Sequence, residues 1–170
     1  MELNDFILEN LSGVKQKITK SLNGLSYHEF IWRPGPECNS IGVILFHMAR
    51  FEDSIVQARL QGKPQIWESE HWYQKLNLPV DASGHGYTKE TLAAFVVPVI
   101  KDLLAYYDAV GIRTIEYLKN IRPAEFDRLI NSPRFGDRPV RTTIGHVLIH
   151  AAEHEGEIAY LRGAQRGLNK

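Results

Sequence analysis

Apolar residues recur every three or four positions along four long segments of this chain, and this spacing is what most limits its fold. The segments cover roughly residues 3–22, 41–61, 88–120 and 143–165, and loops rich in proline or glycine separate them. Residues spaced in this way lie on one face of an α-helix, and no segment alternates convincingly as a β-strand does. The sequence therefore predicts an all-α protein, specifically a four-helix bundle.

Local signals predict how these helices begin, end and connect. Gly24 is placed to end the first helix, and Ser26 with Glu29 forms a capping box that predicts a short helical turn. Residues 63–87 are predicted to be a long ordered loop, with one helical turn, between the second and third helices; loops of this length often border a site. Pro98 is predicted to kink the third helix.

The segment before the last helix contains two further short features. Residues 123–126 are predicted to form a helical turn. Residues 131–141 hold two prolines and a glycine, which predicts a loop or a tight hairpin. The whole chain, residues 1–170, is then a single domain.

Composition excludes several classes of protein. The 20 basic and 20 acidic residues cancel, and no basic stripe indicates a nucleic-acid partner. The N-terminal residues lack the pattern of a signal peptide, and no apolar run approaches the roughly 18 residues of a membrane span. The single cysteine, Cys38, suits a reducing compartment. We therefore expect a cytoplasmic protein that acts without a membrane or a nucleic acid.

Three of the seven histidines lie at four-residue intervals in the last segment, as His146, His150 and His154. Residues four apart are neighbours on one helix face, so two adjacent imidazoles can bind one metal ion. At about 100° per residue, His154 falls within the apolar stripe of this helix, His150 at its border and His146 further out. His150 and His154 are therefore predicted to face the bundle interior.

His47 lies on the buried face of the second predicted helix. Several apolar residues of that helix lie within about 80° of it on a helical projection. Glu52 and Asp53 fall off this stripe and are predicted to be solvated. A third imidazole thus faces inward from another helix.

Three buried imidazoles are difficult to explain as apolar core, since an unsatisfied buried polar group costs about 1–3 kcal/mol. A divalent ion bound by His47, His150 and His154 satisfies all three and leaves coordination positions open, as in catalytic zinc sites. Three imidazoles suit zinc, nickel, copper or iron. A hydrogen-bonded histidine cluster that only joins the two helices stays open as the alternative.

Other candidate groups lie close to these histidines in the sequence. Residues 150–154 read H-x-x-E-H, in which Glu153 is the general base of one class of metalloproteases, but that class needs an acidic ligand well downstream and only sixteen residues follow His154. Glu157 falls between His146 and His150 on the projection. Its candidate roles there are those of an acid, a base or a hydrogen-bonding partner of a histidine. Cys38 precedes the second helix, where a helix N-terminus can activate a thiol; an incidental thiol is the simpler interpretation.

These motifs resemble those of the DinB/YfiT-like superfamily over almost the whole chain. The resemblance rests on residues 40–47, SIGVILFH, preceded by Trp32-Arg33-Pro34, and on the pattern H-x-x-x-H-x-x-x-H-x-G-[QE]-I over residues 146–158. It implies a bundle of up-down-down-up type, a homodimer, and a divalent metal, zinc or nickel, held by three histidines. The ligands carried over by position are His47, His150 and His154.

The resemblance also bears on function. Glu157 stands where the family commonly has glutamine. Members with known activity are similar to thiol-dependent transferases and isomerases that use thiols such as bacillithiol or mycothiol, and others are described as metal-dependent hydrolases. The resemblance thus implies a metal-dependent S-transferase or hydrolase that acts on a small molecule, with a low-molecular-weight thiol as a further cofactor. A non-catalytic metal-binding, structural or stress-related bundle protein is the alternative, so the sequence leaves open whether the chain is an enzyme.

Overall fold

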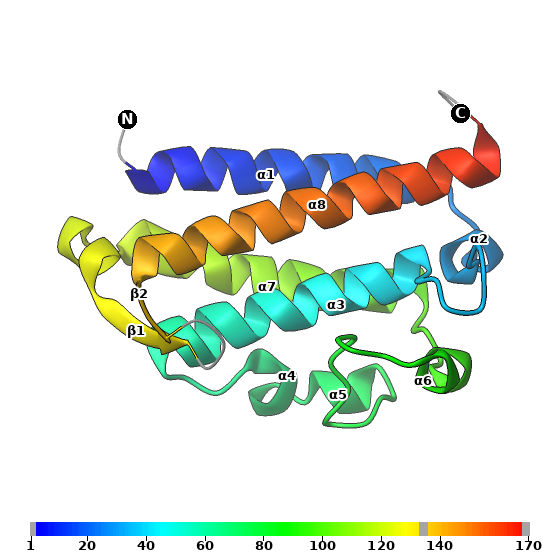
Figure 1. Ribbon diagram of the computed structural model, residues 1–170, viewed down its shortest axis with the longest axis horizontal. Helices are drawn as coiled ribbons and strands as arrows, with labels where there is room; N and C mark the ends of the chain where they lie inside the picture. Colours follow the sequence, from blue (N-terminus) through cyan, green and yellow to red (C-terminus); the bar gives the residue numbers. More distant parts are fainter. Residues whose placement is uncertain (1–2, 133–135, 168–170) are drawn as a thin grey trace.

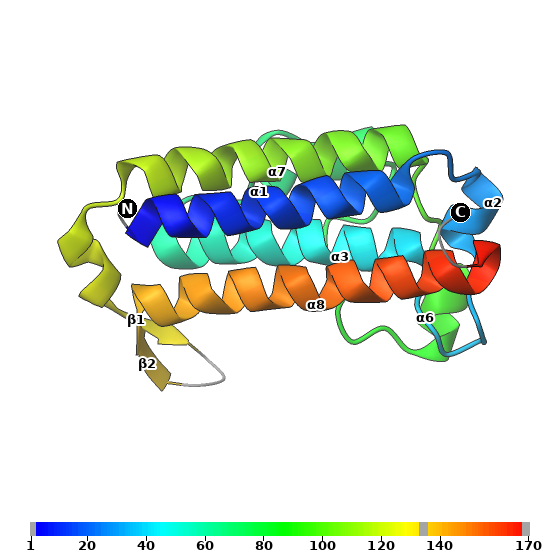
Figure 2. The same cartoon turned by 90° about the horizontal axis from the view of Figure 1, so that it is seen from above.

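Four long helices dominate the computed structural model, which describes residues 3–132 and 136–167. They are α1 (Leu3–Leu22), α3 (Ile41–Asp53), α7 (Ile100–Asn120) and α8 (Val140–Arg166). Helices α1 and α3 each contact both α7 and α8, so the four lie side by side (Figures 1 and 2). The prediction of a mostly helical protein is confirmed.

Short elements connect these helices. A two-stranded antiparallel sheet pairs Leu129 with Pro139 and Ser132 with Gly136. Of the loop or tight hairpin predicted for residues 131–141, the hairpin alternative agrees with this sheet, which begins two residues earlier and ends at Pro139. Residues 133–135 of that prediction lie outside the described residues. The short elements are α2 (Tyr27–Ile31), the π-helix η1 (Ser54–Leu60), α4 (Ile66–Ser69), α5 (Trp72–Lys75), α6 (Lys89–Ala94), the 3₁₀-helix η2 (Pro123–Asp127), β1 (Leu129–Ser132) and β2 (Gly136–Pro139).

The predicted caps are present where helices begin. The hydroxyl of Ser26 accepts a hydrogen bond from the backbone N–H of Glu29, and the Glu29 carboxylate accepts one from the backbone N–H of Ser26 at 2.7 Å. The hydroxyl of Ser40 accepts a bond from the N–H of Val43 at the start of α3. Each satisfies N–H groups that have no partner within the helix.

The third predicted helix is interrupted, not kinked. The chain leaves α6 at Phe95, whose ψ is 113°, and re-enters a helix only after Val99, whose ψ is 147°. Pro98 explains the break, because its ring disfavours helical angles in the preceding residue and its nitrogen cannot donate a hydrogen bond. The single helix predicted for residues 88–120 is therefore two helices, α6 and α7.

Two further segments differ from their predictions. The second predicted helix, residues 41–61, changes into the π-helix η1 at Ser54, and the sequence pattern does not show this change. The loop of residues 63–87 contains two short helices, α4 and α5, where one helical turn was predicted.

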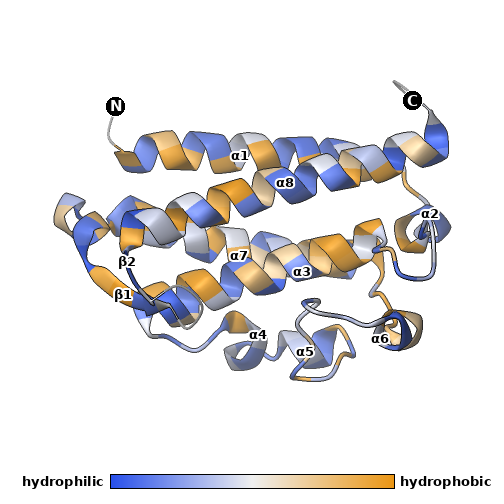
Figure 3. Ribbon diagram, in the orientation of Figure 1, coloured by the Kyte–Doolittle hydropathy of each residue, from blue (hydrophilic) through white to orange (hydrophobic). Residues whose placement is uncertain are grey.

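The apolar core has two parts. Large side chains of α3, α7 and the 63–87 loop form the first, around Phe46, Trp67 and Tyr106. The second lies near the hairpin and includes Ile55 and Val140. Within α3, the N-terminal half is more hydrophobic than the C-terminal half (Figure 3). Among the described residues, no helix has both the length and the apolar character needed to cross a membrane.

The prediction that Glu52 and Asp53 are solvated is wrong. Asp53 is fully buried and its carboxylate accepts hydrogen bonds from the backbone N–H groups of Ile66 and Trp67, at 3.0 and 2.9 Å. The carboxyl of Glu52 accepts a bond of 2.5 Å from the hydroxyl of Thr114 and is 9% exposed. Because α7, α8 and α4 all pack against α3, its polar face is covered along with its apolar one.

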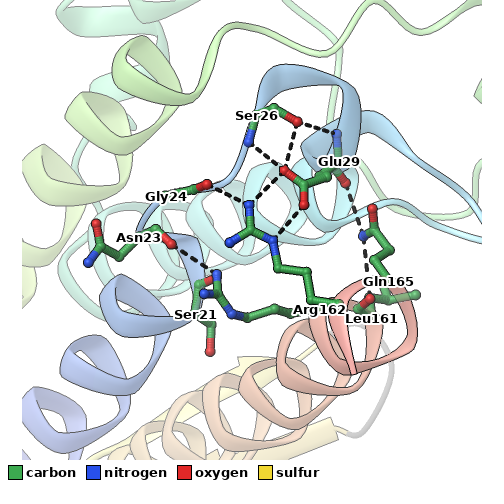
Figure 4. Close-up of polar contacts among 9 residues, drawn as sticks. Ser21, Asn23, Gly24, Ser26, Glu29, Leu161, Arg162 and Gln165 are labelled. Atoms are coloured by element: carbon green, nitrogen blue, oxygen red, sulfur yellow. Dashed lines mark hydrogen bonds and ion pairs between the residues drawn. The ribbon is translucent and has the colours of Figure 1, made fainter. Parts of the chain in front are cut away.

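The C-terminal turn of α8 is tied to the end of α1 (Figure 4). The guanidinium of Arg166 donates to both oxygens of the Glu29 carboxylate and to the carbonyl of Gly24. The guanidinium of Arg162 donates to the carbonyl of Ser21 at 2.6 Å. These arginines satisfy carbonyls at and just beyond the C-terminus of α1 and so join the first helix to the last.

Candidate metal centre

Three histidines from two helices bring their ring nitrogens together between α3 and α8. His47 lies on α3, and His150 and His154 lie one turn apart on α8. The Nε2 atom of His150 is 3.0 Å from Nε2 of His47 and 3.1 Å from Nε2 of His154. One ring nitrogen from each lies within 4.8 Å of the others. These are the three histidines that the helical projection singled out.

Packing around the cluster fixes the orientation of the rings. Phe51, one turn after His47 on α3, stacks on the ring of His150 with the ring centroids 3.8 Å apart. The ring of His146 is exposed and meets the edge of Phe51 at 5.4 Å. His146 therefore stays at the margin of the cluster, as its position on the projection predicted.

The loop of residues 63–87 covers the cluster on its α3 side. Gly84 has a φ of +72°, and a Cβ atom there would lie 2.9 Å from Cα of His47. The ring of His85 stacks beside that of His47, with centroids 5.8 Å apart. Arg50 holds this loop in place by donating to the carbonyl of Ala82 at 3.0 Å. No partner for His85 could be inferred from the sequence, and the two glycines that flank it, Gly84 and Gly86, are the one signal of a tight turn there.

The environment keeps two of the imidazoles neutral at pH 7. Burial lowers the pKa of His47 to about 4, and the neighbouring His154 and His85 act in the same direction. Burial, followed by the charges of His154 and His47, lowers the pKa of His150 to about 3. Neutral imidazoles have a ring nitrogen with a free lone pair, which is the form that binds metal ions.

The two carboxylates singled out near these histidines differ in their contacts. Glu157 reaches His154, with Oε2 2.7 Å from Nδ1, and not the edge between His146 and His150 where the projection placed it. Glu153 is exposed and lines, together with Glu157 and Cys38, a surface groove of about 540 Å³. Glu157 therefore contacts a site histidine, whereas Glu153 and Cys38 lie along the adjoining groove.

The hydrogen bonding of the cluster is incomplete. A neutral imidazole nitrogen has either one proton or one lone pair. Nε2 of His150 thus cannot form two separate hydrogen bonds of normal geometry with its two neighbours. In addition, Nδ1 of His47 is buried without a hydrogen bond of normal geometry, although the backbone of Ser83 lies close enough to oppose the fall in its pKa. The arrangement allows a metal site, because one cation can accept all three Nε2 lone pairs.

Comparisons with known proteins agree with this fold. A crystal structure of a conserved protein from Enterococcus faecalis is similar to this chain with a TM-score of 0.86, at 24% sequence identity and with 96% of each chain covered. No curated protein matches the sequence significantly. The family model of the DinB superfamily matches residues 10–158, which is most of the chain. The chain therefore belongs to the DinB superfamily.

Proposed function

We propose that this chain is a divalent-metal-binding bundle protein that acts as a metal-dependent enzyme on a small molecule. His47, His150 and His154 would hold the ion through their Nε2 atoms, and zinc or nickel is the metal we expect. The reaction that we propose is either the transfer of a group to or from a low-molecular-weight thiol or a hydrolysis.

The close approach of the three Nε2 atoms is the observation that supports this proposal most strongly. At most one of these contacts, of 3.0 and 3.1 Å, can be a normal hydrogen bond, because Nε2 of a neutral His150 has either one proton or one lone pair. A cation between the three atoms would remove this conflict without protonating His47 or His150, whose pKa values are low. Three nitrogen ligands also match the donor set of catalytic zinc sites, which keep a position free for water or substrate.

The chemistry follows from that donor set. A divalent ion with an open position lowers the pKa of bound water toward about 7, or binds and activates a thiolate. The three histidines would hold the ion. Phe51 packs on the ring of His150 and the loop around Gly84 packs on His47, while the α8 side of the cluster lies next to the groove that contains Glu153 and Glu157.

The architecture that we propose is a four-helix bundle of up-down-down-up type. The sequence colours in Figures 1 and 2 support it, because α1 and α8 run in one direction and α3 and α7 in the other. We further propose a homodimer in the cytoplasm that acts on a small-molecule substrate without a nucleic-acid or membrane partner, as expected from the family resemblance, the single cysteine and the balanced charge.

Metal analysis of the purified protein tests the proposal. Wild-type protein should contain about one divalent ion per chain, and His150→Ala should lose it because one of three ligands is gone. His146→Ala is the matched control, since this histidine lies on the same helix outside the cluster; it should keep the ion. A triple alanine variant of His47, His150 and His154 that retains a full complement of metal would refute the proposal.

The alternative is a non-catalytic protein in which the ion only joins two helices. One observation favours it: the ligands come from α3 and α8, so a bound ion would link them and add its binding free energy to folding. Chelation should then lower the melting temperature strongly, and small anions such as azide should not change the spectrum of a cobalt-substituted protein. A spectral change on adding azide would show an open coordination position and support the enzyme.

A further inference from the structure

Glu157 makes the one contact between a carboxylate and a ring nitrogen of the cluster in the part of the chain that the structure describes. Its Oε2 lies 2.7 Å from Nδ1 of His154, one turn away on α8. The side chain of His154 is 18% exposed and that of Glu157 is 53% exposed, so the pair lies where the cluster meets solvent and the groove.

This contact determines which nitrogen of His154 carries the proton. An ionised carboxylate only accepts hydrogen bonds, so Nδ1 of His154 must be the donor. Nε2 of a neutral His154 then has no proton, and its lone pair is directed at the cluster, where Nε2 of His150 lies 3.1 Å away. Histidine side chains in water favour the opposite tautomer, with the proton on Nε2. Glu157 therefore holds His154 in the form that can bind a metal ion.

The charge of Glu157 also acts beyond its hydrogen bond. Its Oε2 lies 2.7 Å from the ring of His154, so a negative charge lies next to the site that would hold a cation, and opposite charges at short range attract. Glutamine at this position would supply an acceptor oxygen but no charge.

We propose that Glu157 is a positioning residue that fixes the Nδ1–H tautomer of His154 and raises the affinity of the three-histidine site for divalent ions. The second part rests on the proposed function, because it requires that the site binds metal. The first part does not, since it concerns the metal-free protein. Outer hydrogen-bonding partners of metal-bound histidines typically change metal affinity by about 10- to 100-fold.

Two substitutions separate the hydrogen bond from the charge. Glu157→Gln keeps an oxygen that can accept from Nδ1 but removes the charge, and Glu157→Leu removes both. Glu153→Leu is the matched control, because Glu153 lies one turn earlier on the same helix and lines the same groove without a contact to a ring nitrogen. All four proteins are first compared by circular dichroism and melting temperature, so that any loss of folding is recognised.

Long-range ¹H–¹⁵N NMR of the metal-free proteins at pH 7.5 measures the tautomer directly, with the His154 signals assigned by a His154→Gln variant. Wild type, Glu157→Gln and Glu153→Leu should show the proton on Nδ1, and Glu157→Leu should shift it toward Nε2. An unchanged tautomer in Glu157→Leu would overturn the positioning role whether or not the protein binds metal.

Competition titrations with zinc and nickel against a chromophoric chelator then measure affinity. Glu157→Leu should bind about 10- to 100-fold more weakly than wild type, Glu157→Gln should lose less, and Glu153→Leu should stay close to wild type. Equal affinities in wild type and Glu157→Leu would overturn the effect on affinity. A wild-type protein that binds neither ion refutes the proposed function and with it the effect on affinity, while the NMR result still decides the tautomer.

Discussion

Replacing Glu52 with glutamine should stabilise the protein, and the gain should grow as the pH rises. The Glu52 carboxyl is buried next to a cavity of about 80 Å³, where it accepts a hydrogen bond from Thr114 and Lys15 lies nearby. Burial raises its pKa, and the Thr114 hydrogen bond and the Lys15 charge oppose the rise only in part. Glutamine has nearly the same shape, and its side-chain oxygen can accept the same bond without ionising.

The size of the effect follows from the two titrations. In the unfolded chain the carboxyl releases its proton near pH 4.5, whereas in the folded protein it keeps it to a higher pH. Between these values the folded state binds one more proton, so the free energy of unfolding of the wild type falls by about 1.4 kcal/mol per pH unit. The free energy of unfolding of Glu52→Gln does not fall in this way, because glutamine does not ionise. The advantage of the variant should be small at pH 4 and should grow as the pH rises through the range in which the folded-state carboxyl still keeps its proton.

Urea denaturation followed by circular dichroism, at steps of one pH unit from 4 to 8, measures this difference. Thr114→Val tests the cause, because removing the donor should raise the carboxyl pKa further and extend the wild-type slope to higher pH. A stability difference between wild type and Glu52→Gln that stays constant with pH, or that changes in favour of the wild type, would refute the reasoning.

Two further predictions concern the loop over the cluster and the end of α8. Gly84→Ala should lower the free energy of unfolding by about 1 kcal/mol or more beyond the loss caused by Gly86→Ala. Both glycines have a positive φ, but only a methyl group at position 84 would press on His47. Equal losses in the two variants, measured by urea denaturation, would contradict this prediction. Arg166→Ala should lower the melting temperature at pH 7, and this loss should shrink below about pH 4.5. The reason is that Arg166 holds the pKa of Glu29 well below its usual value, and the ion pair no longer stabilises the folded protein once the carboxylate is protonated. A loss of the same size at pH 7 and pH 3 would argue against an ionic origin.

Local sequence signals predicted the elements whose residues interact mainly with their neighbours in the chain. The bounds of α1 and the capping box at Ser26 were predicted correctly, because helix periodicity and caps depend on residues three or four apart. The break at Pro98 and the π-helix after Asp53 were missed. Periodicity shows which residues share a helix face, but it does not show whether a proline kinks or ends a helix, or where an α-helix changes into a π-helix.

The difference between local signals and contacts made by distant residues also explains which parts of the site could be predicted. His47, His150 and His154 could be selected from the sequence, because a polar residue on an apolar helix face is visible on a projection. The burial of Glu52 could not, since a projection assumes one covered face and α3 is covered on several; eleven of its thirteen residues are buried. The contact of Gly84 with His47 depends on a loop whose path the sequence does not indicate.

The pairing of α1 with α8 has a consequence for synthesis of the protein. Helix α1 is synthesised before the other described helices but packs against α8, which is synthesised after them, and the arginines that join their ends belong to the C-terminal part of α8. At about 5–20 residues per second, α1 waits roughly 7–30 s before its partner is complete, with its apolar stripe uncovered. Among the described helices, α1 therefore offers chaperones that bind exposed apolar helices the longest opportunity, and truncations that remove the end of α8 should increase aggregation of the protein during translation.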